Sequence, residues 1–191
     1  MRFTRWTVVD PRLSVGCHRL PVMSITGVQR SWPATNATDE LRLHWEFLDF
    51  LRATALIKAT GLTPDQAIET PLPTSPLMSV LGVVKHLTAV ERYWLTRTAG
   101  GSTAPLLWDP DDATAEWHIG PHDTPTAVLA AYRDEWTTAR DACAGLTPDD
   151  PTRGDPDRTV RWVLAHLIQE TARHVGHLDI LREHLDGETG E

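Results

Sequence analysis

The chain has 191 residues, a formal net charge of −8 at pH 7 and an ordinary hydrophobic content of 41%. A chain of this length can bury one sizeable core, so we expect one domain. The negative charge offers no electrostatic surface for nucleic acid or an anionic membrane. No apolar run approaches the ~20 residues of a membrane span, and the N-terminus lacks the apolar stretch of a signal peptide.

The two cysteines, Cys17 and Cys143, lie far apart and form no CxxC pattern. A disulfide framework is therefore not expected, and a reducing compartment is favoured. Together with the missing signal peptide, this predicts a cytoplasmic protein.

Residues 1–37 show no sustained hydrophobic periodicity and are rich in Pro, Ser and Thr. We expect an irregular or disordered extension there. A helical domain should follow over residues 38–187, and residues 188–191 should form a short tail.

Hydrophobic periodicity and capping residues predict four long helices and one short helix. Thr63 and Gln66 have the spacing of a capping box before the short helix. No stretch shows a convincing strand pattern, so four amphipathic helices would bury their apolar faces most simply as a bundle. The expected long helices cover 38–60, 79–98, 124–145 and 159–185.

A long acidic loop, residues 102–123, separates the second and third long helices. Loops of this length in compact domains are often functional or mobile. Because this connection and the next one are both long, the order in which the helices pack stays open.

The last predicted helix has polar side chains in the middle of its apolar stripe. Positions at alternating steps of four and three form one face of a packed helix, and this face is apolar at both ends. Glu170, His174 and His177 occupy its centre. A buried carboxylate without a partner is costly or becomes protonated, so this stretch faces either a partner or water.

His86 repeats the anomaly on the second long helix. It lies three residues after Val83 and four before Val90, so it shares their buried side. Glu170 and His174 are one helical turn apart, a spacing that lets both bind one divalent ion. Two nitrogens and one oxygen would leave a coordination position open, as in catalytic zinc sites.

Other interpretations stay open on spacing alone. A single histidine on an apolar face is more often a hydrogen-bonded core residue, and a Glu-x3-His pair can lie on the surface. The polar stripe becomes a solvated face if the helix is rotated so that Leu164, Val175 and Leu178 point inward. His166 extends the i,i+4 series, and we expect it in the pocket wall or behind the ligands.

Three strings resemble the DinB/YfiT-like superfamily, and more narrowly its mini-circle-protein subgroup. They are HLTAVERYWL at 86–95, AEWHIGPHDT at 115–124 and TVRWVLAHLIQETARHVGHLDILREHLDG at 159–187. The resemblance covers roughly residues 38–190, and the last string is its most specific part. It implies an all-α, DinB-like four-helix bundle with a divalent metal ion in a pocket at one end.

The resemblance also implies the metal ligands. In this superfamily a histidine of the second long helix joins two ligands one turn apart on the last helix, which here match His86, Glu170 and His174. Many members have two histidines on the last helix, so Glu170 is a departure from that pattern. The related mycothiol-dependent maleylpyruvate isomerases are similar in using His, Glu and His. Zinc is the expected metal and nickel is an alternative, and manganese and iron are further alternatives because a carboxylate ligand tolerates harder ions.

The resemblance and the residues together suggest a metal-dependent S-transferase or isomerase that joins a low-molecular-weight thiol such as mycothiol to a small electrophile. A metal ion lowers the pKa of a thiol, and His177 is the candidate proton shuttle, or else a group behind the ligands. Arg173 and Arg182 could bind carboxylates, although such helix residues are more often solvated. Trp117 could cover the pocket and Trp162 could pack beneath it, although a core position is commoner for any single tryptophan.

Two other functions fit the same residues. A hydrolase would use the same metal ion to activate water. A non-catalytic protein could bind a metal ion or a small molecule, or form a homodimer through its helices. An enzyme should tolerate loss of its metal ligands without unfolding, whereas a structural site should not.

Overall fold

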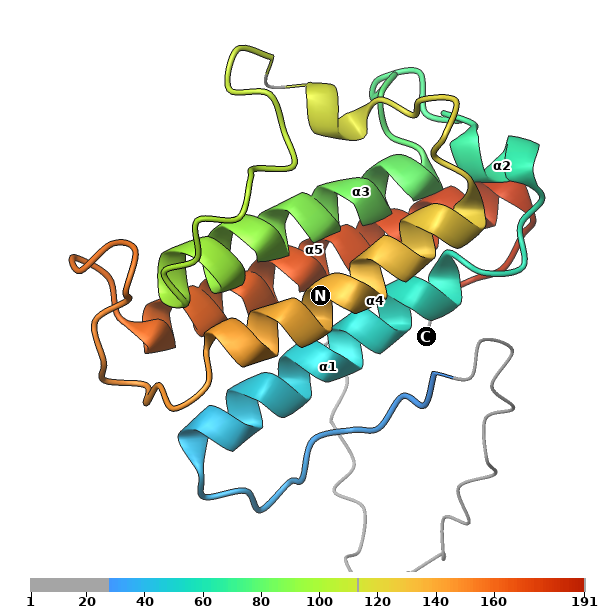
Figure 1. Cartoon of the computed structure of the whole chain (residues 1–191). Helices are drawn as coiled ribbons and strands as arrows, with labels where there is room; N and C mark the ends of the chain where they lie inside the picture. The colour runs from blue at the N-terminus through green and yellow to red at the C-terminus, as the bar shows by residue number, and fades with distance from the viewer. Residues whose placement is uncertain (1–27, 113, 191) are drawn as a thin grey trace, which may run out of the picture.

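The computed structural model describes residues 28–112 and 114–190, and in these ranges the chain forms helices joined by loops, with no strand (Figure 1). Four long helices lie side by side, which confirms the prediction of an all-α bundle. One short helix and a single 3₁₀ turn complete it. The helices are α1 (Glu40–Lys58), α2 (Pro64–Ile68), α3 (Val80–Glu91), α4 (Pro125–Ala142) and α5 (Val160–Leu185).

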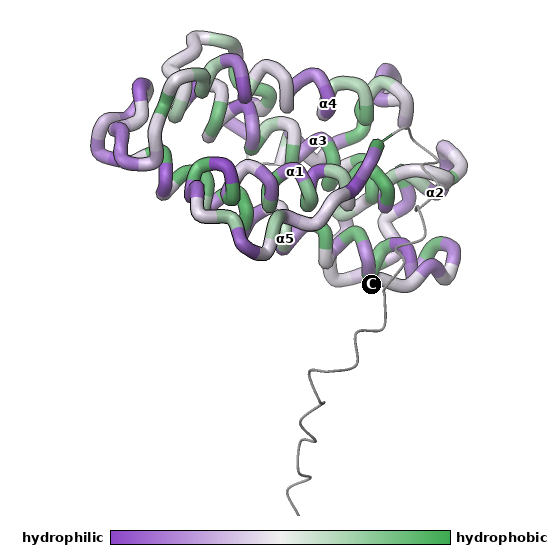
Figure 2. The backbone as a smooth tube through the Cα atoms, turned by 90° about the horizontal axis from the view of Figure 1, so that it is seen from below, coloured by the Kyte–Doolittle hydropathy of each residue, from purple (hydrophilic) through white to green (hydrophobic). Residues whose placement is uncertain are grey.

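The packing partners of the helices decide which faces become core. Helix α1 packs along α5, α3 packs along α4, and α3 also contacts α5. Figure 2 shows apolar and polar positions alternating along the helices, as amphipathic helices require. Within the described residues no helix is both long and apolar enough to cross a membrane.

Most helices begin where the sequence places capping residues. Thr63 and Gln66 form the reciprocal capping box: the Gln66 N–H donates to Thr63 Oγ1 at 3.2 Å, and the Thr63 N–H donates to Gln66 Oε1 at 3.0 Å. Asp39 caps α1 by accepting from the Arg42 N–H. These bonds satisfy N–H groups that have no partner inside the helix. The side chains of Ser79, Thr124 and Thr159 cap α3, α4 and α5 in the same way.

The sequence predicts one long helix over residues 79–98, but the α-helical part ends at Glu91. Helix α3 is continued by a π-helical segment, η1 (Arg92–Ala99). Two side chains of η1 reach the same buried carboxylate of α4: Arg92 Nε donates to Glu135 Oε2 at 2.8 Å, and Thr96 Oγ1 donates to Glu135 Oε1 at 2.5 Å. An apolar pattern two turns long does not distinguish α from π geometry, so the sequence does not reveal this change.

Helix α5 is buried over a wider face than one stripe, because α1 and α3 both contact it. Leu167 and Leu181 of the predicted stripe are fully buried, but so are Leu164 and Leu178 of the alternative stripe. Glu170 therefore lies at the edge of the buried face, with 16% of its side chain exposed. The polar stripe is neither central core nor a fully solvated face.

Segments outside the four long helices also contact the bundle. Trp32 stacks on Phe50 of α1 with ring centroids 4.2 Å apart, and the Ala34 N–H donates to Glu46. At the other end of the chain, the Thr189 carbonyl accepts from Lys58. The expected N-terminal extension falls mostly on residues 1–27, which lie outside the described residues.

Candidate metal centre

Two neighbouring helices bring His86 of α3 together with Glu170 and His174 of α5. His86 Nε2 lies 3.5 Å from Glu170 Oε1, and His174 Nε2 lies 3.1 Å from the same oxygen. One ligand atom from each residue lies within 4.8 Å of the other two, so the set could hold a single metal ion. Two imidazoles and a carboxylate are a ligand set that zinc and several transition metals accept.

The Nδ1 atoms of the two imidazoles have partners of their own. His86 Nδ1 lies 2.8 Å from Glu116 Oε1, and His174 Nδ1 lies 3.2 Å from His177 Nδ1. Because an ionised carboxylate only accepts, a neutral His86 carries its proton on Nδ1 and directs the lone pair of Nε2 towards Glu170. Two acceptors then face each other, an arrangement that a cation between them stabilises, so these residues fit a metal ion.

The protonation states of the α5 residues suit metal binding. Burial, and next the charge of His86, lower the pKa of His174 to about 4. Burial raises the pKa of Glu170, but His174 and His86 outweigh it and hold that pKa below its usual value. At neutral pH the His174 imidazole is therefore uncharged and the carboxylate is ionised, which is the form in which each binds a metal.

The three candidate ligands are only partly covered. The exposed fractions of their side chains are 12% for His86, 16% for Glu170 and 8% for His174. Arg173, expected near the substrate, is largely exposed, and its Nη1 lies 3.6 Å from Glu170 Oε2. If these three residues hold a metal ion, their partial exposure leaves room for a small molecule beside it.

Trp117, in the 3₁₀ turn η2 (Ala115–Trp117), lies directly against the ligands. Its ring stacks on His86 with centroids 4.3 Å apart and an interplanar angle of 15°, and lies 5.8 Å from the His174 ring. The long loop thus lies over α3 (Figure 1), and its Trp117 covers one face of the His86 ring. His118 and His122 of the same loop are both exposed.

Trp162 and His166, the other residues expected in the pocket wall, form a separate aromatic cluster. Their rings stack at 5.1 Å, and His166 also lies edge-on to Trp94 at 4.8 Å. His166 precedes Glu170 by one turn of α5. Among the described residues, neither Trp162 nor His166 has a hydrogen bond or ring contact with the three candidate ligands. Their contact with a substrate stays a prediction.

Arg182 was expected either to bind a carboxylate of thiol or substrate or to be solvated, and the structure shows it buried and bound to other groups of the protein. Arg182 is only 4% exposed, and its Nη1 donates to the carbonyls of Lys58 and Thr60 at 2.7 and 2.9 Å. It also forms an ion pair with Asp186. These bonds satisfy the open carbonyls at the end of α1, so Arg182 joins α1 to α5 and is not available to a ligand.

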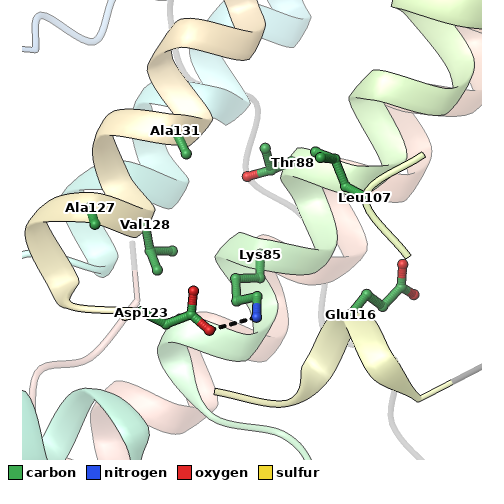
Figure 3. A pocket seen from close by; sticks show the side chains of 8 residues that line it. All are labelled: Lys85, Thr88, Leu107, Glu116, Asp123, Ala127, Val128 and Ala131. Carbon is green, nitrogen blue, oxygen red and sulfur yellow. Dashed lines mark hydrogen bonds and ion pairs between the residues drawn. The ribbon is translucent and has the colours of Figure 1, made fainter. Parts of the chain in front are cut away.

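Glu116 is the residue at this centre that sequence reasoning missed. It is one of several acids in an acidic loop, and no motif or spacing distinguishes it from the others. Glu116 also lines a pocket of about 310 Å³ between α3, α4 and the loop (Figure 3). The wall of this pocket is mostly apolar, and its charged groups include Lys85 and Asp123, which form an ion pair at 2.7 Å. Glu116 therefore lines this pocket and also contacts the candidate ligand His86.

The sequence was compared with known protein families, and the match includes all three candidate ligands. The sequence model of the family described as mycothiol S-transferase matches residues 43–187, which include the three candidate ligands. No curated protein matches the chain. The family lies in the DinB-like superfamily, so the resemblance is confirmed at that level. With about three quarters of its length matched, the chain belongs to the mycothiol S-transferase family.

Proposed function

We propose that this protein is a metal-dependent transferase that joins the sulfur of a low-molecular-weight thiol, mycothiol first, to a small electrophile. The main support is the convergence of His86, Glu170 and His174, which each place one nitrogen or oxygen atom within 4.8 Å of the others. The chain that holds this group belongs to the mycothiol S-transferase family. Zinc is the first choice of metal, followed by nickel, manganese and iron.

In this proposal His86, Glu170 and His174 hold the metal ion. When bound there, a divalent ion lowers the pKa of a thiol, so that a thiolate is present at neutral pH. Glu170 contributes one negative charge, which offsets part of the charge of the ion. Within the described residues the one free thiol, Cys143, lies in a different part of the core, and this favours an external thiol as the nucleophile.

His177 is proposed to accept the proton that the thiol releases. Its Nδ1 faces His174 Nδ1 at 3.2 Å, so its Nε2 is the nitrogen left to exchange a proton with a substrate. The pKa of an ordinary imidazole lies near neutrality, which suits this exchange. Trp117 shields one face of His86 from water by stacking on it. The new bond joins the thiol sulfur to the electrophilic carbon, and the leaving group departs with the bonding electrons.

The first test is the metal content of purified protein, measured by elemental analysis before and after incubation with zinc. Wild-type protein should hold close to one equivalent, and His86→Ala should hold almost none. His122→Ala is the matched control, because His122 is an exposed histidine of the loop. Wild-type protein that binds no metal even after incubation would overturn the proposal.

The second test is turnover of mycothiol with 1-chloro-2,4-dinitrobenzene, in which a carbon–sulfur bond forms and chloride leaves. We expect a rate that depends on the metal, on mycothiol and on Glu170. Metal-dependent ester hydrolysis without thiol transfer would instead support the hydrolase alternative. Metal binding without turnover of either kind would support a binding protein.

A further inference from the structure

The segment 115–123 of the long loop contacts the candidate metal centre through two consecutive residues. Glu116 Oε1 lies 2.8 Å from His86 Nδ1, and the Glu116 side chain is 15% exposed. Trp117 stacks almost parallel on the same imidazole, with centroids 4.3 Å apart. One contact acts in the plane of the His86 ring and the other on its face, so together they restrain both the rotation and the tilt of that ring.

The same segment is attached to α3 close to these two contacts. Lys85, the residue before His86, donates from Nζ to the His118 carbonyl at 2.6 Å and to Asp123 Oδ2 at 2.7 Å. Asp123 Oδ2 also accepts from the Gly120 N–H at 2.7 Å. Figure 3 shows Lys85 and Asp123 meeting to the left of the turn that carries Glu116.

The backbone of the segment also approaches α3 closely. A Cβ atom added at Gly82 would lie 3.1 Å from the Trp117 carbonyl oxygen, a distance shorter than an ordinary van der Waals contact. Glycine at this position, one turn before His86, therefore lets the segment lie directly on the helix. The segment is packed onto α3 and is not a free loop tip.

We propose that Glu116 is the positioning residue of the metal centre, and that segment 115–123 is a structural part of it. Glu116 holds His86 in the tautomer with the proton on Nδ1 and directs Nε2 to the side of Glu170. This rests on the metal centre put forward above, because a positioning role has meaning only if His86 is a ligand. Hydrogen-bond partners of this kind typically change metal affinity by roughly 10- to 100-fold.

The test compares zinc affinity, from competition with a chromophoric chelator, in wild type, Glu116→Ala, Glu116→Gln and Asp111→Asn. Asp111 is an exposed acid of the same loop, so its variant controls for the loss of one negative charge. We expect zinc to bind roughly 10- to 100-fold more weakly to Glu116→Ala. The zinc affinity of Glu116→Gln should lie between those of the wild type and Glu116→Ala, because the glutamine amide oxygen still accepts from the His86 Nδ1–H.

A second readout separates positioning from general support of the fold. Long-range ¹H–¹⁵N NMR spectra should show His86 protonated at Nδ1 in the wild type, and a mixture of tautomers in Glu116→Ala. Lys85→Met removes the two hydrogen bonds that attach the segment to α3 and leaves His86 itself unchanged. Like Glu116→Ala, it should therefore weaken zinc binding. Circular dichroism melts should be unchanged for Glu116→Gln.

The outcomes distinguish this inference from the proposed function. Wild-type protein without metal affinity overturns both. Wild-type protein that binds zinc, with Glu116→Ala within twofold of the Asp111→Asn control and an unchanged His86 tautomer, overturns the role of Glu116 and leaves the metal centre standing. Weaker zinc binding with a changed tautomer supports the positioning role.

Discussion

Arg52 of α1 and Glu91 of α3 form a two-bond ion pair in which both side chains are completely buried. Arg52 Nε lies 2.9 Å from Glu91 Oε1, and Nη2 lies 2.5 Å from Oε2. Glu91 follows His86 by five residues on the same helix, and α1 packs along α5. Because α1 packs along α5, which carries Glu170, this ion pair helps to fix the position of α3, and with it His86, relative to Glu170.

Arg52→Met should destabilise the protein by about 3 to 5 kcal/mol, because it leaves a carboxylate buried without its partner. The double variant Arg52→Met, Glu91→Met should cost clearly less, since neither member of the pair is left buried without its partner. The free energies of unfolding come from urea titration. Arg42→Met, which breaks the exposed pair with Glu46, should leave the free energy of unfolding nearly unchanged, because solvent screens such a pair. A double variant as unstable as the single one would contradict this account of the pair.

His177→Ala should keep the metal ion but lower kcat for thiol transfer by roughly 100-fold, the scale of one general acid–base group. The reason is that His177 contacts His174 and is not one of the three candidate ligands. Metal content and kcat are measured on the same preparation. His184→Ala, an exposed histidine further along α5, should change neither. An unchanged kcat in His177→Ala would exclude its role in proton transfer.

The metal-free protein should lose stability as the pH falls from about 6.5 towards 4. The pKa of folded His174 is lowered to about 4 from 6.5, so in this interval the unfolded chain binds a proton that the folded chain does not. A difference of that size corresponds to roughly 3 kcal/mol, present above the ordinary histidine pKa and lost once both states are protonated.

This pH effect is measured by urea unfolding of chelator-treated protein at pH 7 and pH 4.5. His174→Gln lacks the titrating group, so the gap in stability between the two pH values should shrink in that variant. A gap of equal size in both proteins would show that other groups cause the acid sensitivity.

Cys143 should react slowly with iodoacetamide at pH 8 in the folded protein. Burial raises the pKa of this thiol to about 11, and only 7% of the residue is exposed, so both thiolate content and access are low. The rate is followed by mass spectrometry in a Cys17→Ser variant, which leaves Cys143 as the single thiol. The same variant in guanidinium chloride should react rapidly. Equal rates in the two conditions would show that the thiol is accessible in the fold.

The start of α2 and the paired groups of α5 are determined by the sequence itself. The capping box of Thr63 and Gln66 formed as predicted because its hydrogen bonds join residues three apart. Glu170 and His174 meet because a helix places residues four apart on adjacent turns, wherever the helix lies. His86 was expected beside them from its helix face and from the family resemblance, and the structure brings its Nε2 to within 3.5 Å of Glu170.

Only the tertiary structure decided which groups surround these residues. Glu116 is one of several acids in residues 102–123, and the one that reaches His86 depends on the path of the loop and its attachment to Lys85. Arg52 and Glu91, 39 residues apart, meet only because two helices pack across the core. A local pattern determines hydrogen bonds within a turn of helix, but it carries no information about contacts between segments that meet only when the whole chain has folded.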